Sequence, residues 1–167
     1  MRRDYDVIIV GASFAGLAVA RQLRGEVLLL DRNEVGAVQT SACGTPLWVI
    51  RALGLEESVL QVHDRLVLHT PGRAVVYDLS DVPFCTFDYK KFCRGLLAQC
   101  RIRFLRTGVT GLAENGVETA SGRFSAPLLV DGSGWRGVLA NGGEVTLPAG
   151  RPFSFGIETK APALDRG

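Results

Sequence analysis

The feature that most constrains the fold is a glycine-rich turn near the N-terminus, between two segments with opposite backbone preferences. Residues 5–10 form a β-branched, apolar run that is typical of a strand buried on both faces of a sheet. Residues 17–24 are good helix formers with apolar positions at spacings of three, and Gly25 follows where a helix should end. The turn between them consists of Gly11, Ala12, Ser13, Phe14, Ala15 and Gly16.

A second apolar run at residues 27–30 follows the helix and ends on an acid, Asp31. A strand, a helix and a second strand in this order form a βαβ unit, whose strands are parallel with a right-handed crossover. The opening segment therefore predicts an α/β fold of the Rossmann-like type, built on a parallel sheet.

A glycine turn in this place favours the binding of a pyrophosphate, because a helix N-terminus offers unpaired N–H groups and the positive end of the helix dipole. Gly11 permits the tight turn, and Gly16 lets the helix lie close to the strand. Ser13 stands at the middle glycine of the G-x-G-x-x-G pattern, where its hydroxyl can donate to a phosphate oxygen. Asp31, about 20 residues after Gly11, can accept hydrogen bonds from a ribose diol. These features predict a dinucleotide site.

The choice of dinucleotide is only partly decided by this segment. Arg32 follows the acid and is a candidate to bind a 2′-phosphate, but Asp31 would repel that phosphate, which disfavours NADP. NAD and FAD both remain open at this point.

The rest of the chain predicts helices mixed with short strands. Residues 32–46 and 132–150 lack hydrophobic periodicity and are rich in glycine, so both are expected to be loops. The other expected elements are a helix at 47–53, a hairpin with strands at 65–70 and 74–79, a helix at 88–99, a strand at 102–105, a meander of short strands at 109–113, 116–119 and 123–124, a buried strand at 126–131 and a strand at 153–159.

Composition excludes several function classes. The 19 basic and 17 acidic residues leave a net charge of +2, which is too balanced for a nucleic-acid-binding protein. No apolar stretch reaches the roughly 18 residues of a membrane span. The four cysteines form no C-x-x-C pair and no zinc-like spacing with the two histidines, so we expect no metal site and a reducing, cytoplasmic setting.

Residues 130–136, Val-Asp-Gly-Ser-Gly-Trp-Arg, resemble the Asp-Gly motif of FAD-dependent oxidoreductases with the p-hydroxybenzoate hydroxylase type of FAD domain. The form of the motif is most similar to that of the geranylgeranyl reductase family. Residues 11–16 with Asp31 resemble the first flavin motif of that family, and residues 41–44, Ser-Ala-Cys-Gly, resemble its Cys-Gly element. The resemblance favours FAD over NAD.

Two further segments extend the resemblance along the chain. Phe87-Asp88 is similar to the pair that opens the helix before the third strand in this family. The meander after residues 102–105 resembles the β-crossover of this flavoprotein class, where an NAD domain would have another helix. The resemblance corresponds to the N-terminal half of the family's longer enzymes. It implies an FAD-binding domain at residues 1–150, with a substrate-domain hairpin insertion at 62–86, and the first strand of a substrate domain at 151–167.

The resemblance also implies site residues. The turn would contact the pyrophosphate, Asp31 the adenosine ribose, and the Val109 backbone the adenine. Asp131 and Gly132 would lie under the flavin-side ribose or the pyrophosphate. No catalytic residue is assigned, and Cys43 is the one candidate near the flavin. The residues implied in cofactor binding are Gly11, Ala12, Ser13, Phe14, Ala15, Gly16, Asp31, Arg32, Cys43, Gly44, Val109, Asp131 and Gly132.

The implied chemistry is hydride transfer from NAD(P)H through FAD to an apolar alkene, or the oxygen chemistry of a related flavin monooxygenase. The alternative is a non-catalytic nucleotide-binding module, or one that requires a partner chain. Because the elements of a second half are missing from the pattern, we also expect self-association or a complementing chain, with no nucleic-acid partner.

Overall fold

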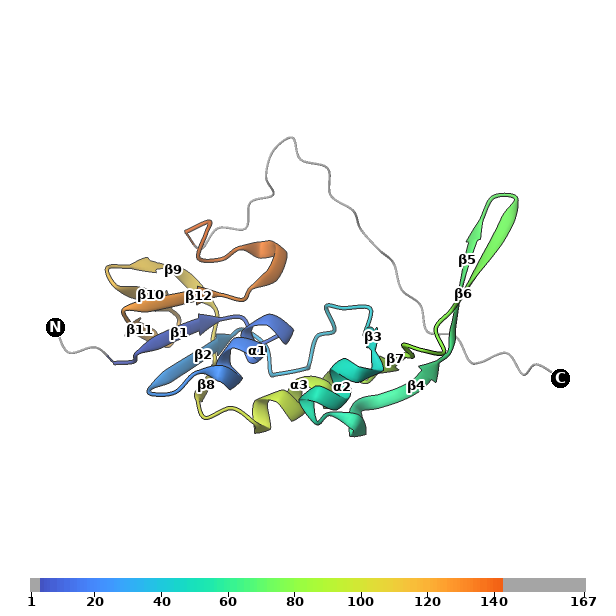
Figure 1. The fold of residues 1–167 in the computed structure, drawn as a ribbon. Helices are drawn as coiled ribbons and strands as arrows, with labels where there is room; N and C mark the ends of the chain where they lie inside the picture. The colour runs from blue at the N-terminus through green and yellow to red at the C-terminus, as the bar shows by residue number, and fades with distance from the viewer. Residues whose placement is uncertain (1–3, 143–167) are drawn as a thin grey trace.

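The computed structural model describes residues 4–142, and its centre is a four-stranded sheet (Figure 1). Hydrogen-bonded neighbours in the sheet follow the order β12 (Leu128–Asp131), β1 (Val7–Val10), β2 (Val27–Asp31) and β8 (Arg103–Arg106). All three pairings are parallel. The α/β class with a parallel sheet is therefore confirmed.

Three α-helices occur in the described part of the chain, close to their expected positions. The first, α1 (Phe14–Gln22), begins earlier than expected, within the glycine-rich turn itself. The second and third, α2 (Leu47–Leu53) and α3 (Tyr89–Ala98), coincide with the expected segments. Asp88 caps α3 by accepting a hydrogen bond from the Lys91 N–H at 2.8 Å. No helix within residues 4–142 has the length and apolar character needed to cross a membrane.

The two faces of the parallel sheet are covered by different structures. Ile9 and Leu29 lie on the face that packs against α1 and α3, in a core cluster with residues of both helices. Ile8 and Leu28 lie on the opposite face, in a second cluster that includes Val117. Successive side chains of a strand point to opposite faces, so the two central strands are buried on both sides. This explains their continuous apolar sequence.

An antiparallel meander covers the second face of the sheet. It consists of β9 (Val109–Ala113), β10 (Gly116–Thr119) and β11 (Gly122–Ser125), with β10 in the middle. The predicted meander is confirmed, including the tight turns between its strands. It follows β8 directly, and the joining residues 107 and 108 pass the carboxyl ends of the parallel strands.

A further antiparallel sheet, separate from the meander, was not expected from the sequence. Its strand order is β3 (Gly44–Pro46), β7 (Phe84–Phe87) and β4 (Val59–His63), and a short 3₁₀ helix (Glu56–Ser58) precedes β4. The expectation that residues 32–46 are entirely loop was therefore wrong at their end. Strands of three to five residues paired across long stretches of chain leave little local pattern from which to predict them.

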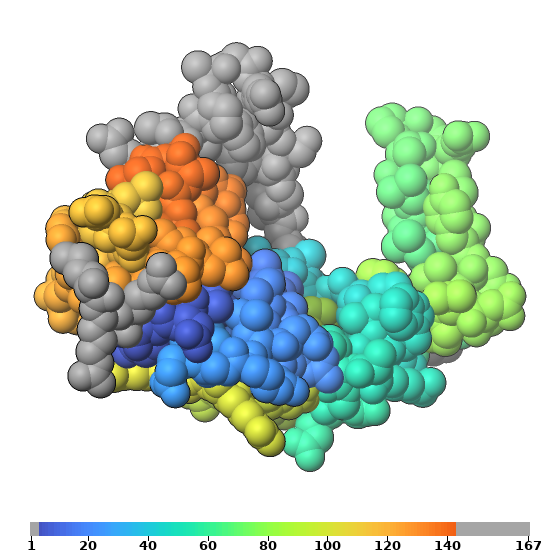
Figure 2. Space-filling view, turned by 60° about the vertical axis from the view of Figure 1, so that its left-hand side comes forward, coloured from blue at the N-terminus to red at the C-terminus, as the bar shows by residue number. Residues whose placement is uncertain are grey.

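A hairpin projects from the body of the molecule. It consists of β5 (Arg65–Thr70) and β6 (Arg73–Asp78), which pair only with each other among the described strands. Figures 1 and 2 both show the hairpin standing apart from the parallel sheet and its helices. The predicted hairpin is confirmed, whereas its membership of a substrate domain stays a prediction. Several apolar side chains on it are exposed, among them Leu66, Val76 and Tyr77.

The last strand of the parallel sheet differs from expectation. Residues 126–131 were expected to form a buried strand, but β12 begins at Leu128 and lies at the edge of the sheet, where Leu128 is 50% exposed. A 3₁₀ helix (Gly134–Arg136) follows within the segment expected to be loop. The strand expected at 153–159 and the domain start expected at 151–167 lie outside the described residues.

Candidate dinucleotide-binding site

A cavity of about 560 Å³ opens at the carboxyl ends of the parallel strands. The connection that follows β1 leads to β2 on one side of β1, while β12 lies on the other side of β1. Ligands of open α/β sheets bind at such a switch in strand order, because the connections diverge there and leave a crevice. The predicted site residues that line this cavity are Gly11, Ser13, Phe14, Ala15, Asp31, Arg32, Val109 and Gly132.

Three glycines bring the walls of the cavity into backbone contact. Gly11 has a φ of +104°, and a Cβ on it would meet the backbone of Gly132. A Cβ on Gly16 would meet the Gly11 carbonyl oxygen, and one on Gly132 would lie 3.0 Å from the Gly16 Cα. The turn, the helix and the loop after β12 therefore approach each other so closely that a Cβ would clash at Gly11 and Gly16 and would be tightly packed at Gly132.

The N-terminus of helix α1 faces the cavity. Ser13 is the N-cap residue, and its side chain makes no capping hydrogen bond to the first turn of the helix. Ser13, Phe14 and Ala15 all line the cavity. The first N–H groups of a helix have no partner within the helix, so these groups and the positive end of the dipole are directed at whatever occupies the cavity.

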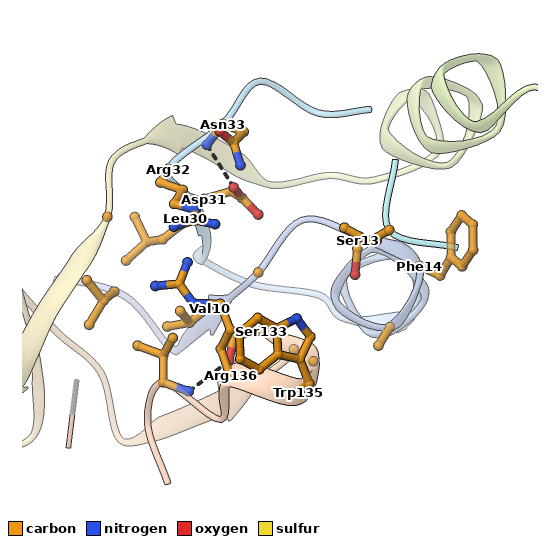
Figure 3. A pocket seen from close by; sticks show the side chains of 18 of the residues that line it. Val10, Ser13, Phe14, Leu30, Asp31, Arg32, Asn33, Ser133, Trp135 and Arg136 are labelled. Atoms are coloured by element: carbon orange, nitrogen blue, oxygen red, sulfur yellow. Dashed lines mark hydrogen bonds between the residues drawn. The ribbon is translucent and has the colours of Figure 1, made fainter. Parts of the chain in front are cut away.

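Asp31 is held against the turn at the end of β2. Its Oδ2 accepts a hydrogen bond from the Ala12 N–H at 2.9 Å, and its Oδ1 accepts one from the Asn33 N–H at 2.8 Å. Figure 3 shows Asp31 and Asn33 joined in this way at one wall of the cavity. Each carboxylate oxygen can accept a further hydrogen bond, so both oxygens retain capacity for a ribose hydroxyl. Asp31 therefore braces the turn and also lines the cavity.

The charged side chains among the described lining residues are Asp31, Arg32 and Arg136. Figure 3 shows Arg32 beside Asp31 and Arg136 on the opposite wall, next to Trp135. Neither arginine forms an ion pair within residues 4–142. Two guanidinium groups, one carboxylate and a helix N-terminus give the cavity a net positive character, which suits a diphosphate.

The Asp131 carboxylate is hydrogen-bonded within its own loop, and its predicted contact with a cofactor stays a prediction. Its carboxylate accepts hydrogen bonds from the Ser133 hydroxyl and N–H, from the Leu139 N–H at 2.8 Å and from the Ala140 N–H at 3.2 Å. Burial by itself would raise the pKa of Asp131, but the hydrogen bonds, first of all from the Ser133 hydroxyl, outweigh it and lower the pKa below its ordinary value. Asp131 does not line the cavity; it folds the loop that supplies Gly132, Ser133 and Arg136.

Cys43 and Gly44 do not line the cavity either. Cys43 is 1% exposed, within the core cluster under the helices, and its thiol donates to the Ser41 carbonyl at 3.2 Å. Ala12 and Gly16 likewise shape the turn without lining the cavity. Contacts of these residues with a cofactor stay predictions.

Several lining residues were not expected from the sequence. Thr40 and Ser41 come from a loop without periodicity, and Thr107 comes from the connection between β8 and β9. Trp135 and Arg136 belong to the Asp-Gly segment, but only the Asp and Gly were predicted to bind. Trp135 is 68% exposed at the rim of the cavity. Within residues 4–142, no group of His, Cys, Asp and Glu side chains is arranged to hold a metal ion.

Comparison with known proteins identifies the fold. No protein-family model matches the chain, and no curated protein matches its sequence. Among solved structures, the flavin-dependent brominase Bmp2 matches with a TM-score of 0.69 and 19% identity, over 83% of this chain and 40% of Bmp2. The myxobacterial chondrochloren halogenase CndH, an FAD-dependent halogenase, matches with a TM-score of 0.60 and 19% identity, over 81% of this chain and 38% of CndH.

The P. aeruginosa protein PqsL, solved in complex with 2-aminobenzoylacetate, matches with a TM-score of 0.60 and 15% identity, over 75% of this chain and 41% of PqsL. This chain therefore has the fold found in flavin-dependent enzymes such as the brominase and the halogenase, and spans about two-fifths of the length of each. The predicted fold class is confirmed at this level. The closer resemblance to geranylgeranyl reductases stays a prediction.

Proposed function

We propose that this chain binds FAD and is the FAD-binding domain of a flavin-dependent oxidoreductase. The observation that supports it best is the meeting of three features around one cavity: the open N-terminus of α1, the Asp31 carboxylate at the end of β2, and the glycine loop after β12. Each feature suits a different part of a dinucleotide. Their juxtaposition depends on backbone contacts that a Cβ would block.

The residues present fit FAD. The N–H groups at the start of α1, with Arg32 and Arg136, would bind the diphosphate. Asp31 would accept from the adenosine ribose, and Val109, beside it in the cavity lining, would contact the adenine. Bound FAD supplies two-electron redox chemistry, so the protein's task is to bind, orient and exclude water. This agrees with a site whose polar groups are suited to a diphosphate and a sugar.

For the reaction, we favour hydride transfer from NAD(P)H through FAD to an apolar alkene, as the Asp-Gly and Cys-Gly segments of the sequence suggest. The related alternative is flavin-based oxygenation. The solved structures of similar fold support a flavin enzyme without separating these two reactions. We place the protein in the cytoplasm, because no disulfide joins its four cysteines.

A second candidate is a nucleotide-binding module that acts with a complementing chain or a second copy of itself, or that is not catalytic. The exposed apolar side chains of the β5–β6 hairpin favour it, because an isolated two-stranded hairpin is only marginally stable in water. Both candidates predict FAD binding when the module is functional. They differ in whether the chain by itself reduces its flavin with NADH or NADPH.

The test is to incubate the purified chain with FAD, remove free cofactor by gel filtration, and record the flavin absorption bands of the protein fraction. We expect a yellow protein with roughly one FAD per chain. Equilibrium dialysis against FAD and NAD in parallel gives the control, and we expect uptake of FAD only. A colourless protein that retains no FAD, or one that binds NAD alone, would refute the proposal. Bleaching of the bands by NADH or NADPH without oxygen then distinguishes the complete oxidoreductase from the partner-dependent module.

A further inference from the structure

One wall of the cavity is attached to the start of helix α3. The hydroxyls of Thr40 and Tyr89 lie 3.1 Å apart, within hydrogen-bonding distance, and Tyr89 is buried. At the other end of the same short loop, the Cys43 carbonyl accepts a hydrogen bond from the Phe87 N–H at 2.9 Å. Residues on both sides of the α3 N-cap therefore hold residues 40–43 at both ends.

The same part of α3 also supports a second part of the cavity wall. Phe14 lines the cavity from the first turn of α1. Its ring packs against Tyr89 with a centroid distance of 5.1 Å, and against Phe92 at 5.0 Å and Phe87 at 5.8 Å. Tyr89 is thus in contact with both walls: its ring touches Phe14 and its hydroxyl touches Thr40.

We infer that Tyr89 is a positioning residue for the cofactor site, which fixes the 40–43 loop relative to the N-terminus of α1. The inference rests on the proposed function, because it assigns Tyr89 a role in binding FAD. The adenosine half of FAD is assigned to Asp31 and Val109, which belong to β2 and β9 rather than to the 40–43 loop. Loss of the Tyr89 hydroxyl should therefore affect the flavin half of the ligand more than the ADP half.

Tyr89→Phe in the full chain keeps the ring beside Phe14 and removes the hydroxyl, and with it both the contact with Thr40 and the interaction with the Cys93 thiol. Thr40→Val removes the partner hydroxyl at nearly constant volume. We expect each substitution to raise the Kd for FAD about three- to tenfold in a flavin-fluorescence titration, and to leave the Kd for ADP, measured by calorimetry, within about twofold. The double variant should bind FAD no worse than Tyr89→Phe alone, because Tyr89→Phe already removes the contact that Thr40→Val removes.

Hydrogen exchange of the ligand-free protein gives a second measurement that does not depend on FAD. In Tyr89→Phe, the amides of residues 41–43 should exchange about three- to tenfold faster than in the wild type, while those of α1 stay within about twofold. Additive effects of the two substitutions, equal losses for FAD and ADP, or unchanged exchange in residues 41–43 would overturn the inference. A wild-type chain that takes up no FAD would refute the proposed function instead, and the exchange measurement would then decide the role of Tyr89.

Discussion

Replacing Gly16 with alanine tests the close approach on which the cavity depends. The added Cβ would meet the Gly11 carbonyl oxygen, a backbone atom that cannot rotate away as a side chain does, so α1 would have to move away from the turn. Overpacking costs about 1–3 kcal/mol, and a backbone neighbour places the cost at the upper end. Alanine is favoured over glycine inside a helix by about 1 kcal/mol, so the net loss of unfolding free energy is about 2 kcal/mol.

Gly95→Ala in α3 is the matched control. A Cβ on Gly95 would meet only the end of the Leu55 side chain, which can shift, so the helix preference for alanine offsets most of the cost. Thermal unfolding followed by circular dichroism compares the two. For a chain of this size, a loss of 2 kcal/mol lowers the Tm by about 4–8 °C, and we expect this for Gly16→Ala but not for Gly95→Ala. If the Gly16 variant melts at or above the Gly95 variant, the argument from close packing is wrong.

Three further predictions follow from the site and the hairpin. Asp31→Asn removes a charge and leaves one acceptor atom for the two backbone N–H groups that Asp31 binds. The Kd for FAD should therefore rise about tenfold to a hundredfold in a fluorescence titration. An unchanged Kd would contradict the assignment of Asp31 to the ribose. Because folding lowers the pKa of Asp131, the ionised carboxylate stabilises the folded protein at pH values above its ordinary pKa of 3.8. This stabilisation is lost as the pH falls through the lower pKa that Asp131 has in the folded state. Urea unfolding between pH 5 and about pH 2 should therefore show a steeper loss of stability in the wild type than in Asp131→Asn, and parallel curves would contradict this. Leu66→Lys on the hairpin should reduce self-association in light scattering, whereas a wild type that stays monomeric at high concentration would argue against an interface there.

The sequence was most informative where local pattern and tertiary position agree. The strand at Val7–Val10, the glycine turn and Asp31 could be predicted because burial on both faces, a helix start and a strand end each leave a local mark in the sequence. The hairpin could be predicted for the same reason. The sequence was less informative about which strand lies at an edge of the parallel sheet, because the apolar residues of β12 resemble those of a central strand.

Features that depend on contacts between distant segments could not be predicted. β3 exists because Gly44 pairs with Thr86, and nothing near Gly44 indicates that partner. Thr40 and Ser41 reach the cavity because α3 holds their loop. The hydrogen bonds of Asp131 likewise depend on how residues 133–140 fold back on it, so its role in organising the loop could not be predicted, and its contact with a cofactor stays a prediction.

The contact between Gly11 and Gly132 has a consequence for the order in which the protein assembles during synthesis. The first strands and α1 emerge early from the ribosome, but the loop that closes their crevice is translated near the end of the described chain. Until then, one side of β1 has no neighbour and the apolar residues of the opening unit are only partly covered. The cavity is thus completed late, and a nascent chain halted before β12 should still bind chaperones.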